Sequence, residues 1–159
     1  MSQRPIPLPT HVEALAEYYI HKAIAILDAR IKAKGIMFLQ PATVTNFLRL
    51  QLESEEREVF AVLFLDNQHR LIEFKRMFFG TINTVNVHPR EVMKEAIKLN
   101  AAAVIFAHNH PSGLAEPSKA DRDITVGLTN ALALVDVRTL DHVVIGHGQT
   151  TSFAERGWI

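Results

Sequence analysis

The stretch that decides the fold is AAVIFAHNHPSGLAEPSKAD, residues 102–121. It opens on AAVIFAH, a short apolar run of the kind that forms a strand buried on both faces of a sheet. The strand ends near His108 and is followed by the sharp turn Pro-Ser-Gly. A helix then begins at Ser118 and continues to about Val135, with apolar residues along one face. The stretch therefore predicts a buried strand, a polar turn and a helix in succession.

Strands and helices alternate on both sides of this stretch. Residues 59–66 form another apolar run, residues 71–80 alternate enough to be its hairpin partner, and residues 137–146 return as a strand. Residues 88–100 predict a helix with Pro89 at its first position, where a missing N–H does no harm. This alternation predicts an α/β protein with three layers, in which helices cover the sheet.

The first 40 residues form an extension in front of the main domain, which we assign to residues 41–159. Residues 1–10 hold three prolines and predict a disordered or extended lead. From residue 11 to residue 34, apolar residues recur at i, i+3 and i+4, which predicts an amphipathic helix that ends at Gly35. This helix could pack against its own domain or against a second copy in a homodimer.

A shorter helix is expected after Pro41, where Val44, Phe47 and Leu48 share one face. The charged stretch ESEER, residues 53–57, follows this helix. We interpret it as the joint between the helical lead and the sheet.

The composition is that of a soluble globular protein and excludes several classes. Of the 159 residues, 48% are hydrophobic and 21% are charged. There is no cysteine, so disulfides and thiolate metal sites are excluded, and any metal must be held by His, Asp or Glu. No apolar run approaches ~18 residues and the first residues lack an apolar signal region. We therefore expect a cytoplasmic protein without a membrane span.

The charge balance disfavours nucleic-acid binding. Lys and Arg number 17, as do Asp and Glu, so the formal net charge is zero. A protein that binds nucleic acid usually carries a basic excess. Local basic clusters lie at Arg30, Lys32 and Lys34, and at Lys75 and Arg76. Clusters of this size are more often solvated faces than binding sites.

The two histidines of the opening stretch are spaced to bind a metal. Side chains two residues apart on a strand point the same way, so His108 and His110 can both aim at one point beyond the end of the strand. Asp121, in the first turn of the next helix, can face back toward that point. Two imidazoles and one carboxylate are three protein ligands, and a catalytic zinc takes three together with a water molecule.

A zinc hydrolase also needs a group that takes a proton from the attacking water, and a glutamate is the usual candidate. Glu58 stands just before the apolar run that starts at residue 59. Spacing alone does not distinguish Glu58 from Glu53, Glu55 or Glu56.

Simpler interpretations of the same residues stay open. Ser118 and Asp121 are spaced as in a helix capping box, although Glu or Gln is commoner in the second place. Alternatively, Ser118 donates a hydrogen bond to a developing oxyanion. His142 follows Asp141, and this pair either orients a metal ligand or satisfies itself at the end of a strand. Asn109 should point away from the two histidines, toward a structural role.

The spacing of the metal-site residues resembles a known motif. The run His108-x-His110-Pro111, then six residues to Ser118 and two more to Asp121, resembles the JAMM (JAB1/MPN/Mov34) metalloprotease motif. The fuller HNHPSG, with HPREVMKEAI upstream and DHVVIG downstream, resembles the RadC-like bacterial branch of that superfamily, over about residues 40–159. The resemblance implies a cytidine-deaminase-like α/β/α fold and hydrolysis of peptide or isopeptide bonds.

The resemblance also implies a role for each site residue. His108, His110 and Asp121 match the ligands of the Zn²⁺ ion. Glu58 matches the glutamate that acts as general acid and base, and Ser118 matches the serine that supports the tetrahedral intermediate. The prediction is therefore a zinc-dependent metallohydrolase, of peptidase or isopeptidase type, acting on a peptide or isopeptide substrate.

Two other classes of function stay open. Longer RadC members carry a helix-hairpin-helix module in front, which binds DNA and which we do not find in residues 1–40. The first alternative is a DNA-repair-associated accessory protein that binds DNA and whose metal is structural. The second is an inactive interaction module, and the complete ligand set argues against it.

Overall fold

The computed structural model describes residues 10–34, 38, 40–81 and 85–159, without the side chains of residues 30–34. The chain divides into two compact units, residues 1–34 and residues 35–159. The first unit contains helix α1 (Thr10–Lys34), so the predicted amphipathic stretch is helical. Thr10, which was predicted to belong to the disordered or extended lead, is the first residue of α1. The rest of the lead, the predicted helix end at Gly35 and the side chains of the first basic cluster lie outside the described residues.

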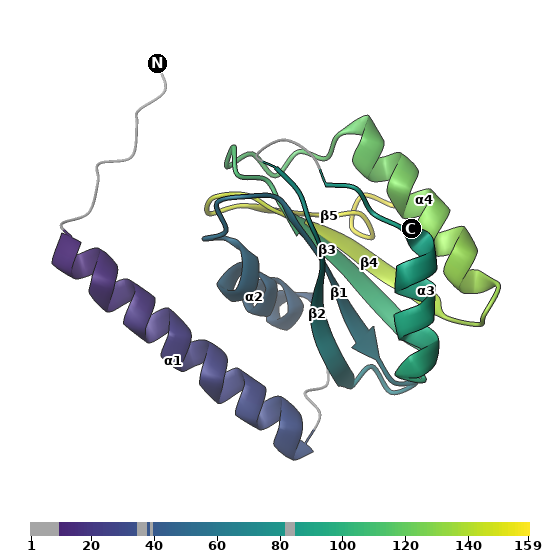
Figure 1. The fold of residues 1–159 in the computed structure, drawn as a ribbon, viewed down its shortest axis with the longest axis horizontal. Coiled ribbons are helices and arrows are strands. Elements are labelled where there is room, and N and C mark those ends of the chain that lie inside the picture. The colour runs from purple at the N-terminus through teal and green to yellow at the C-terminus, as the bar shows by residue number, and fades with distance from the viewer. Residues whose placement is uncertain (1–9, 35–37, 39, 82–84) are drawn as a thin grey trace. The chain divides into compact units, whose positions relative to one another are not determined.

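The second unit is a five-stranded sheet with helices on both faces, which confirms the predicted α/β fold. The strand order is β2-β1-β3-β4-β5. Helix α2 lies on one face, and α3 and α4 lie on the other (Figure 1). The elements are α2 (Pro41–Leu52), β1 (Val59–Leu65), β2 (Leu71–Phe79), α3 (Pro89–Lys98), β3 (Ala103–Asn109), α4 (Lys119–Ala133), β4 (Arg138–Ile145) and β5 (Thr150–Ser152).

Both faces of the sheet bury side chains because β1 and β3 are apolar along nearly their whole length. All seven residues of each strand are buried, and alternate residues point to opposite faces. The face toward α2 covers Val44, Phe47 and Leu48, the three residues that the sequence predicts to be buried. The cluster beneath α3 and α4 includes Phe60, Val62, Phe64, Val92, Ala96, Val104, Phe106, Leu128 and Leu132.

The directions of the strands bring distant parts of the chain together at one end of the sheet, where β1 begins and β3 ends. β3 and β4 are parallel and are joined through α4, whereas β1 is antiparallel to both β2 and β3. Phe60, near the start of β1, therefore pairs with His108, near the end of β3. Residues that precede β1 consequently lie beside residues that follow β3.

The three-residue strand β5 pairs antiparallel with β4 and was not predicted from the sequence. Among the helices that the structure describes, none is both long enough and apolar enough to cross a lipid bilayer.

Candidate metal centre

The turn after β3 sets the position of the two histidines. His108 is buried near the end of β3, and the His110 N–H continues the pairing by donating to the Ile145 carbonyl at 2.8 Å. The Gly113 N–H then donates to the His110 carbonyl at 2.9 Å and closes a tight turn. Gly113 has a φ of +87°, in the left-handed region that glycine adopts without strain. The turn therefore holds His110 against the end of the sheet.

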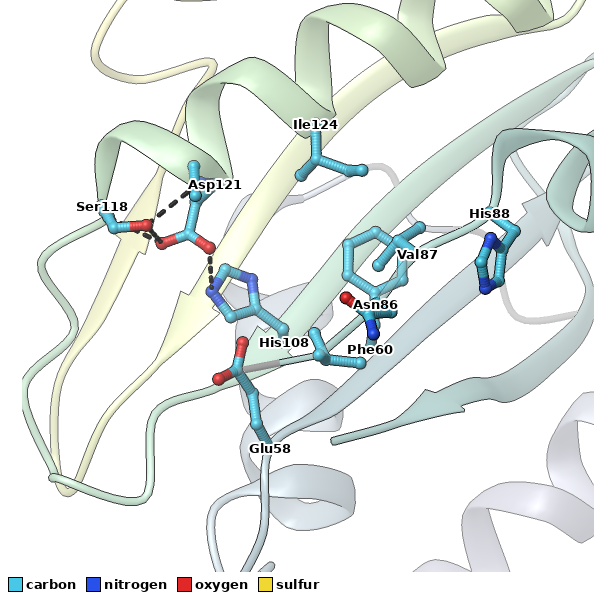
Figure 2. Close-up of a pocket in the computed structure, with 11 residues that line it drawn as sticks. Glu58, Phe60, Asn86, Val87, His88, His108, Ser118, Asp121 and Ile124 are labelled. Carbon is cyan, nitrogen blue, oxygen red and sulfur yellow. Dashed lines mark hydrogen bonds and ion pairs between the residues drawn. The ribbon is translucent and has the colours of Figure 1, made fainter. Parts of the chain in front are cut away.

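The first turn of α4 presents Asp121 to the same point. Ser118 is the N-cap residue, and its Oγ accepts a hydrogen bond from the Asp121 N–H at 3.1 Å. The Asp121 Oδ2 atom accepts in return from the Ser118 N–H at 2.6 Å and from the Ser118 hydroxyl at 2.8 Å. The capping box is thus present, and the same carboxylate also faces His108 (Figure 2) and lies 3.5 Å from the His110 ring. The structural and the metal-site interpretations of Asp121 are compatible.

Four side chains converge at this end of the sheet. One ligand atom from each of Glu58, His108, His110 and Asp121 lies within 4.8 Å of the other three. The His108 Nε2 atom is 2.9 Å from the His110 Nε2 atom and 3.3 Å from Asp121 Oδ1. The His110 Nε2 atom is 3.5 Å from Asp121 Oδ2. All the residues predicted as metal ligands or as the base therefore come together, and Ser118 lies beside them as the cap of α4.

The structure selects one glutamate from the four candidates. Glu58 is buried, with an exposed fraction of 6%, and its carboxylate points toward the ring of His108 (Figure 2). Glu53 and Glu55 instead form ion pairs with arginines of α2 and β2, and Glu56 is exposed. Glu58 reaches the centre because it precedes β1, whose antiparallel pairing starts beside the end of β3.

Burial and charge shift the pKa values of these groups in different directions. Burial raises the pKa of Glu58, and the nearby His108 and His110 only partly oppose this effect. Burial also acts to raise the pKa of Asp121, but contact with the imidazole rings of His108 and His110 outweighs it and holds this pKa far below its usual range. Contact with the Asp121 carboxylate raises the pKa of His110. The centre thus holds a firmly ionised carboxylate and a second one that takes up a proton more readily.

The donor atoms fit a metal ion. The His110 Nδ1 atom is 2.8 Å from the Leu114 carbonyl oxygen. A carbonyl can only accept a hydrogen bond, so Nδ1 carries the proton, and in the neutral ring Nε2 presents its lone pair to the centre. His108 directs its Nε2 atom to the same place. Such nitrogen atoms repel each other unless a cation or a proton lies between them, and nitrogen and oxygen ligands of this kind suit Zn²⁺.

His142 contacts the centre, but not by way of Asp141. Its ring Nε2 atom is 2.8 Å from the His108 Nδ1 atom. The Asp141 carboxylate accepts hydrogen bonds from the His142 backbone N–H at 2.7 Å and from the Ser152 hydroxyl at 2.6 Å. Because neighbouring residues on a strand point to opposite faces, the carboxylate and the ring cannot meet. Asp141 therefore contacts His142 through the backbone alone, and the His142 ring contacts the predicted metal ligand His108.

A pocket of about 300 Å³ lies beside the four converging residues (Figure 2). Phe60 and Ile124 supply apolar surface, and the extended segment 85–88 borders another side. The motif HPREVMKEAI begins at His88, but no motif marks residues 85–87. Their place follows from tertiary packing, so sequence reasoning missed them. The same holds for Thr125, which is buried on α4 and contacts His142.

Comparison with known families gives a match over most of the chain. The sequence model of the family described as RadC-like JAB domain matches residues 38–158. The chain belongs to this family. A relative named UPF0758 protein from Vibrio cholerae serotype O1 is 58% identical over 140 residues, which are 88% of this chain and 87% of the relative.

Two further relatives carry the same name. The one from Aeromonas hydrophila is 57% identical over 126 residues, and the one from Cellvibrio japonicus is 61% identical over 125 residues. Each alignment covers 79% of this chain but 56% of the relative, so the chain spans about half the length of these two proteins. The names of the relatives state no reaction, and the function has to be argued from the site.

Proposed function

We propose that this protein is a zinc-dependent hydrolase that cleaves peptide or isopeptide bonds. The observation that carries the proposal is the convergence of Glu58, His108, His110 and Asp121 beside a pocket. His108, His110 and Asp121 would hold the Zn²⁺ ion. When bound, this ion would lower the pKa of a water molecule toward about 7 and polarise the carbonyl oxygen of the substrate.

Glu58 would act as general base and then as general acid. Its raised pKa suits a group that must gain a proton and give it up again near neutral pH. Its carboxylate takes a proton from the attacking water and passes it to the leaving amine. Because Asp121 stays ionised, Glu58 is the carboxylate of the pair that can carry this proton.

Ser118 would stabilise the tetrahedral intermediate. Its hydroxyl borders the pocket and donates to Asp121 Oδ2 at 2.8 Å. Asp121 Oδ2 keeps a second hydrogen bond, from the Ser118 backbone N–H. The hydroxyl can therefore turn toward a developing oxyanion without leaving the carboxylate unsatisfied.

The pocket supports a neutral amide as substrate. Among the described residues that line it, the acids are Glu58 and Asp121, and none is Lys or Arg that would bind a free carboxylate. Phe60, Val87 and Ile124 offer apolar surface for a side chain next to the scissile bond. A peptide or isopeptide bond within a longer chain meets both requirements.

The test combines metal analysis with a cleavage screen on a peptide library. The variant Glu58→Gln should keep the metal and lose turnover by about 10²–10⁴-fold, the usual contribution of a general base. The matched control is Glu56→Gln, at an exposed position two residues earlier. His110→Ala should abolish zinc binding. Full turnover in the Glu58 variant would contradict the assigned base, and unchanged zinc stoichiometry in the His110 variant would contradict the ligand set.

DNA binding gains no support from the second basic cluster. Lys75 forms an ion pair with Glu95, and Arg76 lies 3.5 Å from a carboxylate oxygen of Glu55. Both cations are thus matched by acids within the same domain. A mobility-shift assay tests this point, because phosphate contacts make affinity fall steeply as the salt concentration rises.

A further inference from the structure

A histidine that is absent from the mechanism above lies buried behind the metal centre. His142 has no exposed surface, and its ring stacks on Phe153 with 4.7 Å between the ring centroids. The rings of Phe60 and Phe106 lie edge-on to it at 5.5 and 5.9 Å. An imidazole in such apolar surroundings is neutral, with one donor nitrogen and one acceptor nitrogen that both need partners. A leucine or phenylalanine would suit a purely packing role better.

Both ring nitrogens of His142 have partners, and each partner belongs to the metal centre or supports it. Nε2 is 2.8 Å from the Nδ1 atom of His108, and Nδ1 is 2.6 Å from the Thr125 hydroxyl. The Thr125 hydroxyl also lies 2.6 Å from the backbone carbonyl oxygen of Asp121. The chain of contacts therefore starts at one ligand and ends at the backbone of another.

The carbonyl at the end of this chain fixes the direction of every hydrogen bond in it. Because the Asp121 carbonyl can only accept, the Thr125 hydroxyl uses its one proton there and must accept from His142 Nδ1. His142 Nδ1 then carries the proton of the ring, and Nε2 accepts. His108 must accordingly donate from Nδ1, so its Nε2 lone pair faces His110 and Asp121.

We propose that Thr125 and His142 are positioning residues that hold His108 in the tautomer required for metal binding. The inference rests on the proposed metal site and deepens it. The Leu114 carbonyl fixes the tautomer of His110 directly, by accepting a hydrogen bond from its Nδ1 atom. The tautomer of His108 is instead fixed through two buried side chains, those of His142 and Thr125. The hydrogen bonds through His142 and Thr125 also connect His108, on β3, to the helical turn that carries Asp121. They therefore fix the positions of the two proposed ligands relative to each other.

The experiment removes only the Thr125 hydroxyl, which fixes the direction of the hydrogen bonds between Asp121 and His108. In Thr125→Val the donor on His142 Nδ1 loses its acceptor, and the ring is free to adopt the other tautomer. It would then donate to His108 Nδ1 and place the His108 proton on Nε2, where it blocks the metal. We expect the affinity for Zn²⁺ to fall by about 10–100-fold, the usual effect of removing such a partner of a ligand. Thr125→Ser keeps a hydroxyl and should restore the affinity.

The structure offers a matched control on the same helix. Thr129, four residues later, has a buried hydroxyl without a hydrogen-bond partner in the part of the chain that is described. Thr129→Val should therefore leave the zinc affinity unchanged. Affinity is measured by competition with a chelator, and the absorption spectrum of the Co²⁺-substituted protein reports whether the ligand geometry changes. Equal affinity in wild type and Thr125→Val would overturn the inference.

A second measurement needs neither a variant nor a metal. Long-range nitrogen–proton correlation spectra of the ¹⁵N-labelled wild type, with metal removed, identify the protonated nitrogen of each neutral imidazole ring. We expect Nδ1–H at both His108 and His142, and Nε2–H at His142 would overturn the inference. Failure to bind metal in the wild type would overturn the proposed function as well, whereas normal wild-type binding with an unaffected Thr125→Val variant overturns the positioning role alone.

Discussion

Replacing Asn109 by alanine should destabilise the protein and slow the proposed reaction while leaving the proposed metal binding intact. Asn109 lies between His108 and His110 in sequence but directs its side chain to the segment before β1, with an exposed fraction of 2%. Its Oδ1 atom accepts from the Val59 N–H at 2.8 Å. Its Nδ2 group donates to the carbonyls of Glu55 and Arg57 at 3.2 and 3.0 Å. One side chain thus holds both flanks of Glu58.

The expected loss of stability follows from these three hydrogen bonds. A typical intramolecular hydrogen bond contributes about 1 kcal/mol, and a buried donor left without a partner costs about 1–3 kcal/mol. Asn109→Ala should therefore lower the free energy of unfolding by about 3 kcal/mol. Urea denaturation at equilibrium measures this change. The matched control is Asn130→Ala, at an exposed position on α4, which should change stability by less than about 0.5 kcal/mol.

The effect on the reaction should separate from the effect on the metal. Glu58 loses its fixed position when the flanking backbone is released, and a displacement of about 1 Å can lower the rate of a reaction 10²-fold. The ligands on β3 and α4 keep their own supports, so zinc affinity should stay near the wild-type value. A stability loss below about 1 kcal/mol, or an unchanged kcat, would refute the role given to Asn109.

Two further predictions concern the metal and the turn. Zn²⁺ at about 100 times its dissociation constant should stabilise the protein by about 2.7 kcal/mol, seen as a chelator-reversible rise of several degrees in Tm; an unshifted Tm would argue against a site in the native state. Gly113→Ala should lower the unfolding free energy by about 1–3 kcal/mol, because φ is +87° and the added Cβ would lie 2.8 Å from His147 Nδ1. Gly127→Ala, on α4 with open space around it, should be neutral or stabilising in the same urea titration, and equal losses in both variants would contradict the argument.

Much of the fold could be predicted because its signals are local. The strands β1 and β3 are buried on both faces and α4 is buried on one, so each has a pattern of apolar residues that can be read from a short stretch of sequence. The two histidines and Asp121 could be placed together for the same reason, since one strand, one turn and one helix start position all three. The strand β5 has three residues, too few to show a pattern of its own.

The residues that sequence reasoning could not place depend on pairing between distant strands. Glu58 is indistinguishable from Glu53, Glu55 and Glu56 until the antiparallel register sets Phe60 against His108. The sequence pairs His142 with the adjacent Asp141, which contacts only its backbone N–H, whereas the partners of its ring nitrogens are separated from it by 34 and 17 residues. Sequence reasoning suggests contacts between residues that are adjacent in the chain. The contacts of Glu58 and of the His142 ring depend instead on how the strands and helices pack together.

The proposed metal ligands are placed mainly by local structure and Glu58 by strand pairing, so a change in the protein can displace one without the other. His108, His110 and Asp121 lie within 14 residues of sequence, so the proposed ligands all come from β3, its turn and the start of α4, with β4 supporting the two histidines through His142 and Ile145. Glu58 arrives from 50 residues earlier and depends on the pairing of β1 with β3 and on the Asn109 contacts. A change that loosens β1 should therefore remove the base before it disturbs the ligands. The fold would thus permit a variant that keeps the proposed metal but lacks the proposed turnover, and zinc content alone would not distinguish that variant from a form with turnover.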